Sequence, residues 1–129
     1  AEGVQIGSAF AVAEESSAHQ NFKQHILNAL EGDTKLRMKK LVPVRLLKNE
    51  FAEKVAQAEA SGATTEILID LLGRARAKSG MFEGDLKDGE LEIGQVSAML
   101  TAIRPAGAIL AEIWEDFIVG VNKIKGFEI

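Results

Sequence analysis

Apolar residues recur every three or four positions through most of the chain, and this spacing predicts amphipathic helices. The first helix is expected to start at a capping box, Ser17-x-x-Gln20, and to end near Gly32, which can take the left-handed position after a helix. Asn49 and then Thr64 or Thr65 are polar residues of the type that caps helix N-termini. The apolar stripes at helical spacing lie within residues 18–30, 51–58, 67–75, 96–103 and 109–121.

Two stretches have a different pattern, which predicts extended structure. Val4–Ile6 forms a short apolar-flanked strand that ends on Gly7 and Ser8. Residues 35–45 alternate between apolar and charged side chains, and Pro43 restricts this segment to a sheet edge or a bend. A lone strand cannot satisfy its own amides and carbonyls. The first strand therefore either pairs with residues 35–45 or has its partners outside this chain.

These elements predict a mainly α protein with a few short strands, an α+β fold class. The expected division is 1–32 for the first strand and its helix, 33–48 for the extended edge segment, and 49–129 for a helical region. Within the last region, residues 79–94 are rich in glycine and poor in periodicity, so we expect an irregular loop there.

Composition and charge exclude several classes of function. The chain has 129 residues, a net charge of −4 and no basic stripe, so we expect no nucleic-acid partner. No apolar run reaches the roughly 18 residues of a membrane span, and we expect no membrane partner. The lack of cysteine fits a reducing compartment, and we expect a cytoplasmic protein.

We also expect no metal site. His19 and His25 are six positions apart and do not share a helical face. The acidic residues between Glu83 and Glu92 do not follow the pattern of a calcium-binding EF-hand loop, and they are expected to form a solvated surface.

Gly7-Ser8, at the end of a predicted strand, is the chief candidate for chemistry. Glycine lets backbone amides approach an anion, and the serine hydroxyl adds a donor, so this pair can hold a phosphate. Gly-Ser pairs also mark ordinary turns, and from the residues alone the turn is the more common interpretation.

A series of motifs extends this interpretation. The motifs are the stretch Gln5-Ile6-Gly7-Ser8, the pairs Glu15-Ser16 and Phe22-Lys23, and the turn Gly94-Gln95. They occur in the order found in the nitronate monooxygenase family, which this chain resembles over nearly its full length. That family includes the flavin-dependent enoyl-acyl-carrier-protein reductases. Ser8 stands where the family usually has threonine, so the hydroxyl is kept.

The resemblance implies the last third of a TIM-barrel flavoenzyme, comprising the last barrel strand and a helical cap. It implies that FMN is the cofactor and that Gln5, Ile6, Gly7 and Ser8 lie against its phosphate, with Gly94 and Gln95 near the flavin. The catalytic histidine of the family would lie upstream, so no catalytic residue is assigned. The substrate would be a nitronate or, in the alternative branch, an enoyl thioester.

Two further alternatives remain open, namely a non-catalytic helical interaction domain and a regulatory subunit that completes a barrel on another chain. An isolated barrel piece would expose apolar faces and strand edges. We therefore expect either a homo-oligomer or association with a missing N-terminal barrel part, and an isolated chain that is colourless and inactive.

Overall fold

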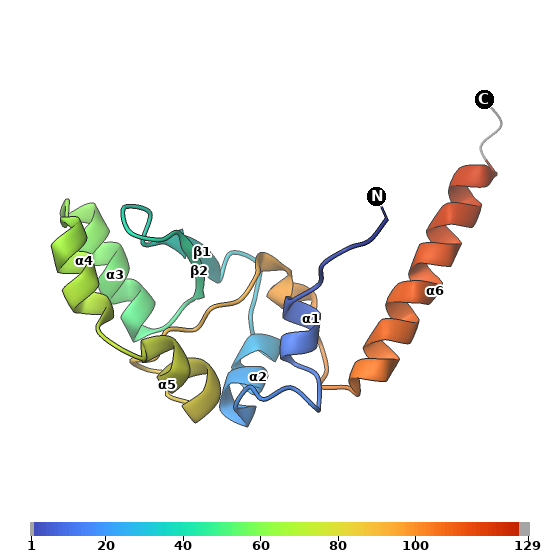
Figure 1. Ribbon diagram of the computed structural model, residues 1–129, viewed down its shortest axis with the longest axis horizontal. Helices are drawn as coiled ribbons and strands as arrows, with labels where there is room; N and C mark the ends of the chain where they lie inside the picture. Colours follow the sequence, from blue (N-terminus) through green and yellow to red (C-terminus); the bar gives the residue numbers. More distant parts are fainter. Residues whose placement is uncertain (1, 127–129) are drawn as a thin grey trace.

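The computed structural model describes residues 2–126, which fold into a helix-rich body with one small sheet (Figure 1). This agrees with the expected mainly α class. The elements in chain order are α1 (Ser8–Ala11), α2 (Gln20–Leu27), β1 (Thr34–Arg37), β2 (Val44–Leu47), α3 (Glu50–Ala60), α4 (Thr65–Leu72), α5 (Arg76–Glu83), the 3₁₀ helix η1 (Gln95–Met99) and α6 (Ala106–Lys125).

The sheet is an antiparallel pair of strands, β1 and β2, in which Thr34 lies opposite Leu47. A later segment adds to the free side of β2. The Leu47 amide donates to the Leu91 carbonyl at 2.9 Å, and the Ile93 amide donates to the Arg45 carbonyl at 3.2 Å. The chain that leads into η1 is therefore fixed to the hairpin by backbone hydrogen bonds.

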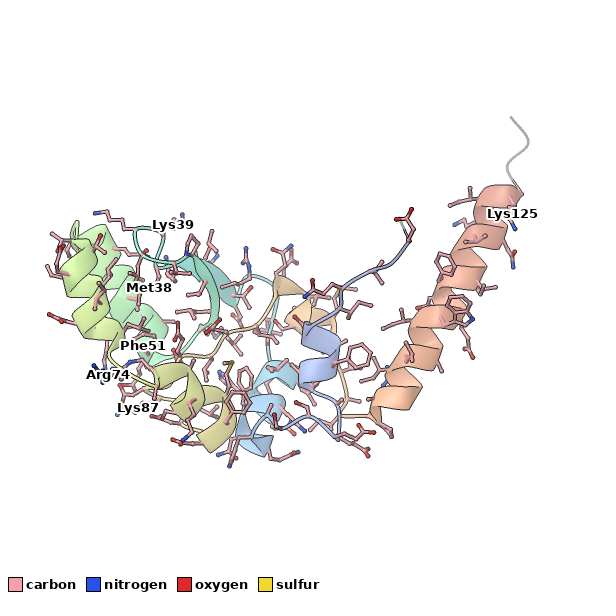
Figure 2. The ribbon with its side chains drawn as sticks, viewed as in Figure 1. Met38, Lys39, Phe51, Arg74, Lys87 and Lys125 are labelled. Carbon is pink, nitrogen blue, oxygen red and sulfur yellow. The ribbon has the colours of Figure 1, made fainter. Side chains whose placement is uncertain are left out.

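Two hydrophobic cores lie on opposite sides of this sheet. Neighbouring residues of a strand point to opposite faces, so Leu46 and Leu47, both 1% exposed, enter different cores. The first core joins α2 to the segment before η1, and its buried members are Val12, Phe22, Ile26, Ala29, Leu47, Leu91 and Ile93. The second joins the hairpin to α3 and α4, and its buried members are Met38, Leu46, Phe51, Ala52, Val55, Ala63 and Leu68. Figure 2 labels Met38 just after β1 and Phe51 on α3.

The helix caps at Asn49 and Thr64 are confirmed. The Ala52 amide donates to the Asn49 side chain at 2.8 Å, and the Ile67 amide donates to the Thr64 hydroxyl at 3.4 Å. Asn49 also donates to the carbonyls of Leu86 and Gly89 at 3.0 and 2.8 Å. One capping residue thus starts α3 and fastens the loop after α5.

The predicted strand at Val4–Ile6 is wrong for this chain. The described residues before Ser8 form neither helix nor strand, and β1 pairs with β2 instead of with this segment. Without a neighbouring strand its amides and carbonyls have no ladder to join. The sequence pattern also did not predict the short helix α1, which follows Gly7 directly.

The predicted limits of two helical stretches also need correction. Ser17 does not cap α2, because His19 takes that place and its Nδ1 accepts from the Asn21 amide at 3.0 Å. Helix α2 ends at Leu27, and Gly32 lies in the following turn. Residues 79–94 were expected to be irregular, but residues 79–83 belong to α5, which ends at Glu83.

Helix α6 lies at one end of the molecule, with the N-terminal segment beside it (Figure 1). Residues 2–7 lead into α1, and α6 runs back in the opposite direction. No helix in residues 2–126 is long and apolar enough to cross a bilayer.

Candidate functional site

The structure brings together two of the predicted site segments, which are 86 positions apart in sequence. The Gly94 amide donates a hydrogen bond of 3.1 Å to the Ser8 hydroxyl oxygen. Ser8 begins α1, and Gly94 directly precedes η1. Because the Ser8 oxygen accepts this bond, its own proton is free to be donated to a ligand.

Close packing favours glycine at position 94. A Cβ added there would lie 2.7 Å from the Ser8 hydroxyl oxygen. The backbone φ of Gly94 is −69°, which any residue can adopt. The preference for glycine therefore comes from the approach of the Ser8 side chain and not from backbone conformation.

The situation at Gly7 is different. A Cβ added at this position would meet nothing within 4 Å, and φ is −103°. Neither packing nor backbone conformation within the described chain explains the glycine. Open space beside Gly7 is what an incoming ligand would need, because a side chain there would hold an anion away from the backbone.

The backbone around Gly7 also has donors to offer. The first four amides of an α-helix have no partner within the helix. No hydrogen bond within the described residues uses the amides of Gln5, Ile6, Gly7 or Ser8. Gln5 and Ile6 are exposed and line an open groove that faces α6. These amides, the Ser8 hydroxyl and the open space beside Gly7 are neutral donors and room of the kind that phosphate oxygens need.

Gln95 lies elsewhere. It is exposed and lines a second groove with Thr34, Arg45 and Val96, between the hairpin and η1. The hydrogen bond between Gly94 and Ser8 connects the start of η1, next to Gln95, to α1. The prediction that Gln95 contacts the flavin stays a prediction.

A buried lysine supports the loop behind this site. Lys23, 3% exposed, donates from Nζ to the carbonyls of Ala13, Glu14 and Ser16 at 2.6, 3.2 and 2.9 Å. The loop that follows α1 is thus closed around one ammonium group. The sequence motif Phe22-Lys23 marked this position, but hydropathy gave no sign that the lysine is buried.

The same loop fixes the start of α6. The Glu14 amide donates to the Arg104 carbonyl at 3.0 Å, and the Glu15 carboxylate accepts from the Ala106 amide at 2.8 Å. That hydrogen bond, helped by the nearby Lys23 charge, lowers the pKa of Glu15 below its ordinary value. Glu15 therefore sits as an anion at the N-terminus of α6.

The two histidines have structural roles in the described chain. Beyond its cap on α2, the His19 ring packs so closely on Gly84 that a Cβ there would lie 2.3 Å from Nδ1. His25 lies 3.3 Å from the Lys48 carbonyl through Nε2. Among residues 2–126 no three His, Cys, Asp or Glu side chains are grouped as metal ligands would be.

Known proteins resemble this chain over nearly its whole length. Residues 1–116 match the family model described as Nitronate monooxygenase. A probable nitronate monooxygenase of Staphylococcus aureus strain JH9 is 33% identical over 131 residues, which covers 99% of this chain and 35% of the relative. A probable nitronate monooxygenase of Bacillus subtilis is 64% identical over a shorter stretch of 36 residues, which covers 28% of this chain and 10% of the relative.

The backbone also matches solved structures. FabK from Thermotoga maritima matches with a TM-score of 0.87 and 29% identity, over 99% of this chain and 40% of that one. The M276A mutant of the same protein matches with a TM-score of 0.80, over 99% of this chain and 38% of that one. The chain spans little more than a third of the length of the S. aureus relative. The match of 116 consecutive residues to one family model shows that this chain belongs to the nitronate monooxygenase family.

Proposed function

We propose that this chain supplies the flavin-phosphate site of an FMN-dependent oxidoreductase of the nitronate monooxygenase type. The observation that carries the proposal is the junction of Ser8 with Gly94, next to a glycine that the chain's own packing does not require. The backbone amides of Gln5–Ser8 and the Ser8 hydroxyl would hold the phosphate. FMN, when bound, would supply the redox chemistry.

The chain's own groups then have separable tasks. Gly7 keeps the approach to the backbone open, and the Ser8 hydroxyl donates its free proton to an anionic oxygen. Gly94 holds that hydroxyl in place through its amide. The Lys23 loop and Glu15 hold α1 against the start of α6, which keeps the site on a rigid support.

A second oxidoreductase remains a candidate, because the backbone matches FabK with a TM-score of 0.87. In that branch the substrate would be an enoyl thioester and the flavin would deliver hydride to it. In the nitronate branch bound FMN would supply the transfer of electrons from the nitronate to oxygen. Ser8 and Gly94 would have the same task in both.

The test compares two ligands that differ only in the phosphate. The ¹⁵N-labelled chain is titrated with FMN and, separately, with riboflavin, and amide shifts are followed by NMR. We expect FMN to move the amides of Gln5–Ser8 and Gly94, and riboflavin to leave those of Gln5–Ser8 in place. Equal shifts with both ligands, or shifts confined to other residues, would refute the phosphate site.

To decide between the two reactions, the chain is assembled with FMN and the barrel portion of a family member, and turnover is measured. Oxygen consumption with propan-2-nitronate supports the monooxygenase, and consumption of an enoyl thioester by the reduced flavin supports the reductase. We expect the isolated chain to be colourless as purified and to be inactive, because most of a flavin pocket would lie in the barrel and FMN added in the titration would be held only through its phosphate. Turnover of a nitronate by the 129 residues alone would contradict this. If the assembled protein binds no flavin, the non-catalytic alternative replaces both oxidoreductases.

A further inference from the structure

The dipeptide Asp88-Gly89 is the only place in the chain where an Asp or Asn residue precedes glycine. A backbone amide can attack the side-chain carbonyl carbon of the residue before it, and glycine leaves that amide unshielded because it has no Cβ. The other Asp residues precede Thr, Leu or Phe, whose side chains hinder the same attack. Asp88-Gly89 is therefore the most reactive aspartyl bond that the sequence contains.

Packing favours glycine at position 89 in spite of this reactivity. A Cβ added there would lie 2.3 Å from the Asp85 carbonyl oxygen and 2.3 Å from the Gly80 Cα. Gly89 is buried, and the Gly80 contact shows that the loop after α5 folds back onto that helix. A less reactive residue would have to open this backbone contact. The fold thus keeps an Asp-Gly pair in the loop.

The Asp88 side chain, unlike Gly89, lies at the surface. Its carboxylate is 44% exposed and, among residues 2–126, has one hydrogen-bonding partner, Lys54 Nζ at 2.6 Å. That hydrogen bond, with the nearby Lys87 and Arg76 charges, lowers the pKa of Asp88 below its ordinary value. A carboxylate anion resists attack by a nitrogen nucleophile far more than a neutral carboxyl group does. Lys54 therefore opposes the rearrangement through a contact between two flexible side chains.

Asp85, in the same loop, has the opposite arrangement. Its Oδ1 accepts from the amides of Lys87 and Asp88, both at 3.0 Å, and its Oδ2 accepts from the Ser79 hydroxyl at 3.4 Å. The residue that follows it is leucine. One aspartate of the loop is thus fixed by backbone donors, and the other is held only by a lysine side chain.

We propose that Asp88-Gly89 is a modification site at which Asp88 converts spontaneously to isoaspartate, at a rate that Lys54 sets by holding the carboxylate. In the first step the Gly89 nitrogen bonds to Asp88 Cγ, and one carboxyl oxygen leaves as water with the carboxyl proton and the amide proton. The product is a five-membered succinimide ring. Water then adds to the ring. Cleavage between the nitrogen and Cγ restores aspartate, whereas cleavage between the nitrogen and the Asp88 backbone carbonyl carbon gives isoaspartate. The mass is unchanged, and nothing is oxidised or reduced.

The modified loop cannot keep its contacts, because the backbone of isoaspartate passes through the side chain and is one methylene longer. In the unmodified loop the Asp88 carbonyl accepts from Arg76 at 2.6 Å, and the Gly89 carbonyl accepts from Asn49 at 2.8 Å. Two positions after Gly89, Leu91 is fully buried in the first core. Modification therefore disturbs the anchors of the loop and the start of a core segment together.

The experiment ages the purified chain at physiological temperature and near-neutral pH. Isoaspartate at each position is quantified by electron-transfer fragmentation in a mass spectrometer, which gives fragment ions specific to the isomer. We expect isoaspartate to form at least ten times faster at Asp88 than at Asp85. The isoaspartyl form, separated by ion exchange, should unfold at a urea midpoint about 1 M below that of the unmodified chain.

Three variants test the role of Lys54. Lys54→Met should raise the rate at Asp88 about two- to fivefold, because an exposed ion pair shifts the balance between carboxylate and reactive carboxyl group by about that factor. Lys78→Met is the matched control, since Lys78 makes a comparable exposed pair with Glu83 at 3.0 Å, and it should leave the rate unchanged. Asp88→Glu keeps the negative charge but would need a larger ring, so it should abolish the modification.

Two results would overturn the proposal. One is an Asp88 that stays unmodified in the aged chain while a peptide of residues 84–92 is converted under the same conditions, which would show that the fold protects the pair. The other is an equal rate in the parent and in Lys54→Met, which would show that Lys54 does not control the reaction. The measurement contains no FMN and involves neither Ser8 nor Gly94, so its outcome is independent of the phosphate site.

Discussion

Lys23→Met is the substitution that most directly tests how the loop behind the site is held. Methionine keeps most of the aliphatic length of lysine and removes the ammonium group. Lys23 is 3% exposed, and its Nζ is the shared donor to three backbone carbonyls. The substitution therefore removes hydrogen bonds with little change in packing volume.

The magnitude follows from the burial of the three acceptors. A hydrogen bond to a charged group contributes about 1.5–3 kcal/mol, and a buried carbonyl left without a donor costs a similar amount. The bond to Ala13 is buried, and those to Glu14 and Ser16 are partly buried, so water can replace the donor at the latter two. We expect a total loss of about 3–5 kcal/mol in the free energy of unfolding.

The assay is urea unfolding followed by far-UV circular dichroism. With an m-value of about 2 kcal/mol/M, the expected loss moves the midpoint down by about 2 M. Lys54→Met is the matched control, because Lys54 makes an exposed ion pair with Asp88 at 2.6 Å and exposed pairs contribute little. Equal midpoints for the two variants would show that Lys23 does not hold the loop, and would refute the reasoning.

Three further predictions concern the site, a helix cap and a buried carboxyl group. Gly94→Ala should lower the free energy of unfolding by about 1–2 kcal/mol, because a Cβ would lie 2.7 Å from the Ser8 oxygen and disturb the hydrogen bond between residues 94 and 8. Gly7→Ala should leave the free energy of unfolding unchanged and abolish the FMN-specific amide shifts. Asn49→Ala should cost about 2–3 kcal/mol in urea unfolding, more than Thr64→Ala, because Asn49 caps α3 and also holds the Leu86 and Gly89 carbonyls; equal losses would contradict this. Burial, with the nearby Glu92 charge, raises the pKa of Glu90, so its stabilising contribution is complete below the unfolded-state pKa and is lost as pH rises through the folded-state pKa. Glu90→Gln should therefore gain stability relative to the parent between pH 4 and pH 8, and a difference that does not change with pH would exclude a shifted carboxyl group.

The sequence by itself determined the features that depend on neighbours in the chain. Asn49 and Thr64 were recognisable as caps because capping requires a side-chain oxygen two or three positions before an unpaired amide. Lys123 and Lys125 in the last turn of α6 follow the same local logic, because they complement the helix dipole. The ordered motifs also placed the chain in its family, which the match of residues 1–116 confirmed.

Predictions from local sequence patterns were wrong where residues distant in the sequence decided the structure. Ser17 and Gln20 form a good capping sequence, yet His19 takes the position, with its ring against Gly84 and its amide bonded to the Met81 carbonyl. Val4–Ile6 has the composition of a strand, but a strand also needs a partner, and the described chain provides none.

Only the tertiary structure decided how the candidate site is assembled. The bond between Gly94 and Ser8 spans 86 positions, and no periodicity could have joined them. Burial of Lys23 likewise depends on three carbonyls that converge only when the loop closes. The sequence predicted the apolar stripe of α6, but it did not predict that this stripe lies exposed on one side of an open groove. A hydropathy pattern identifies the helix face that must be covered, and it does not identify the part of the molecule that covers it.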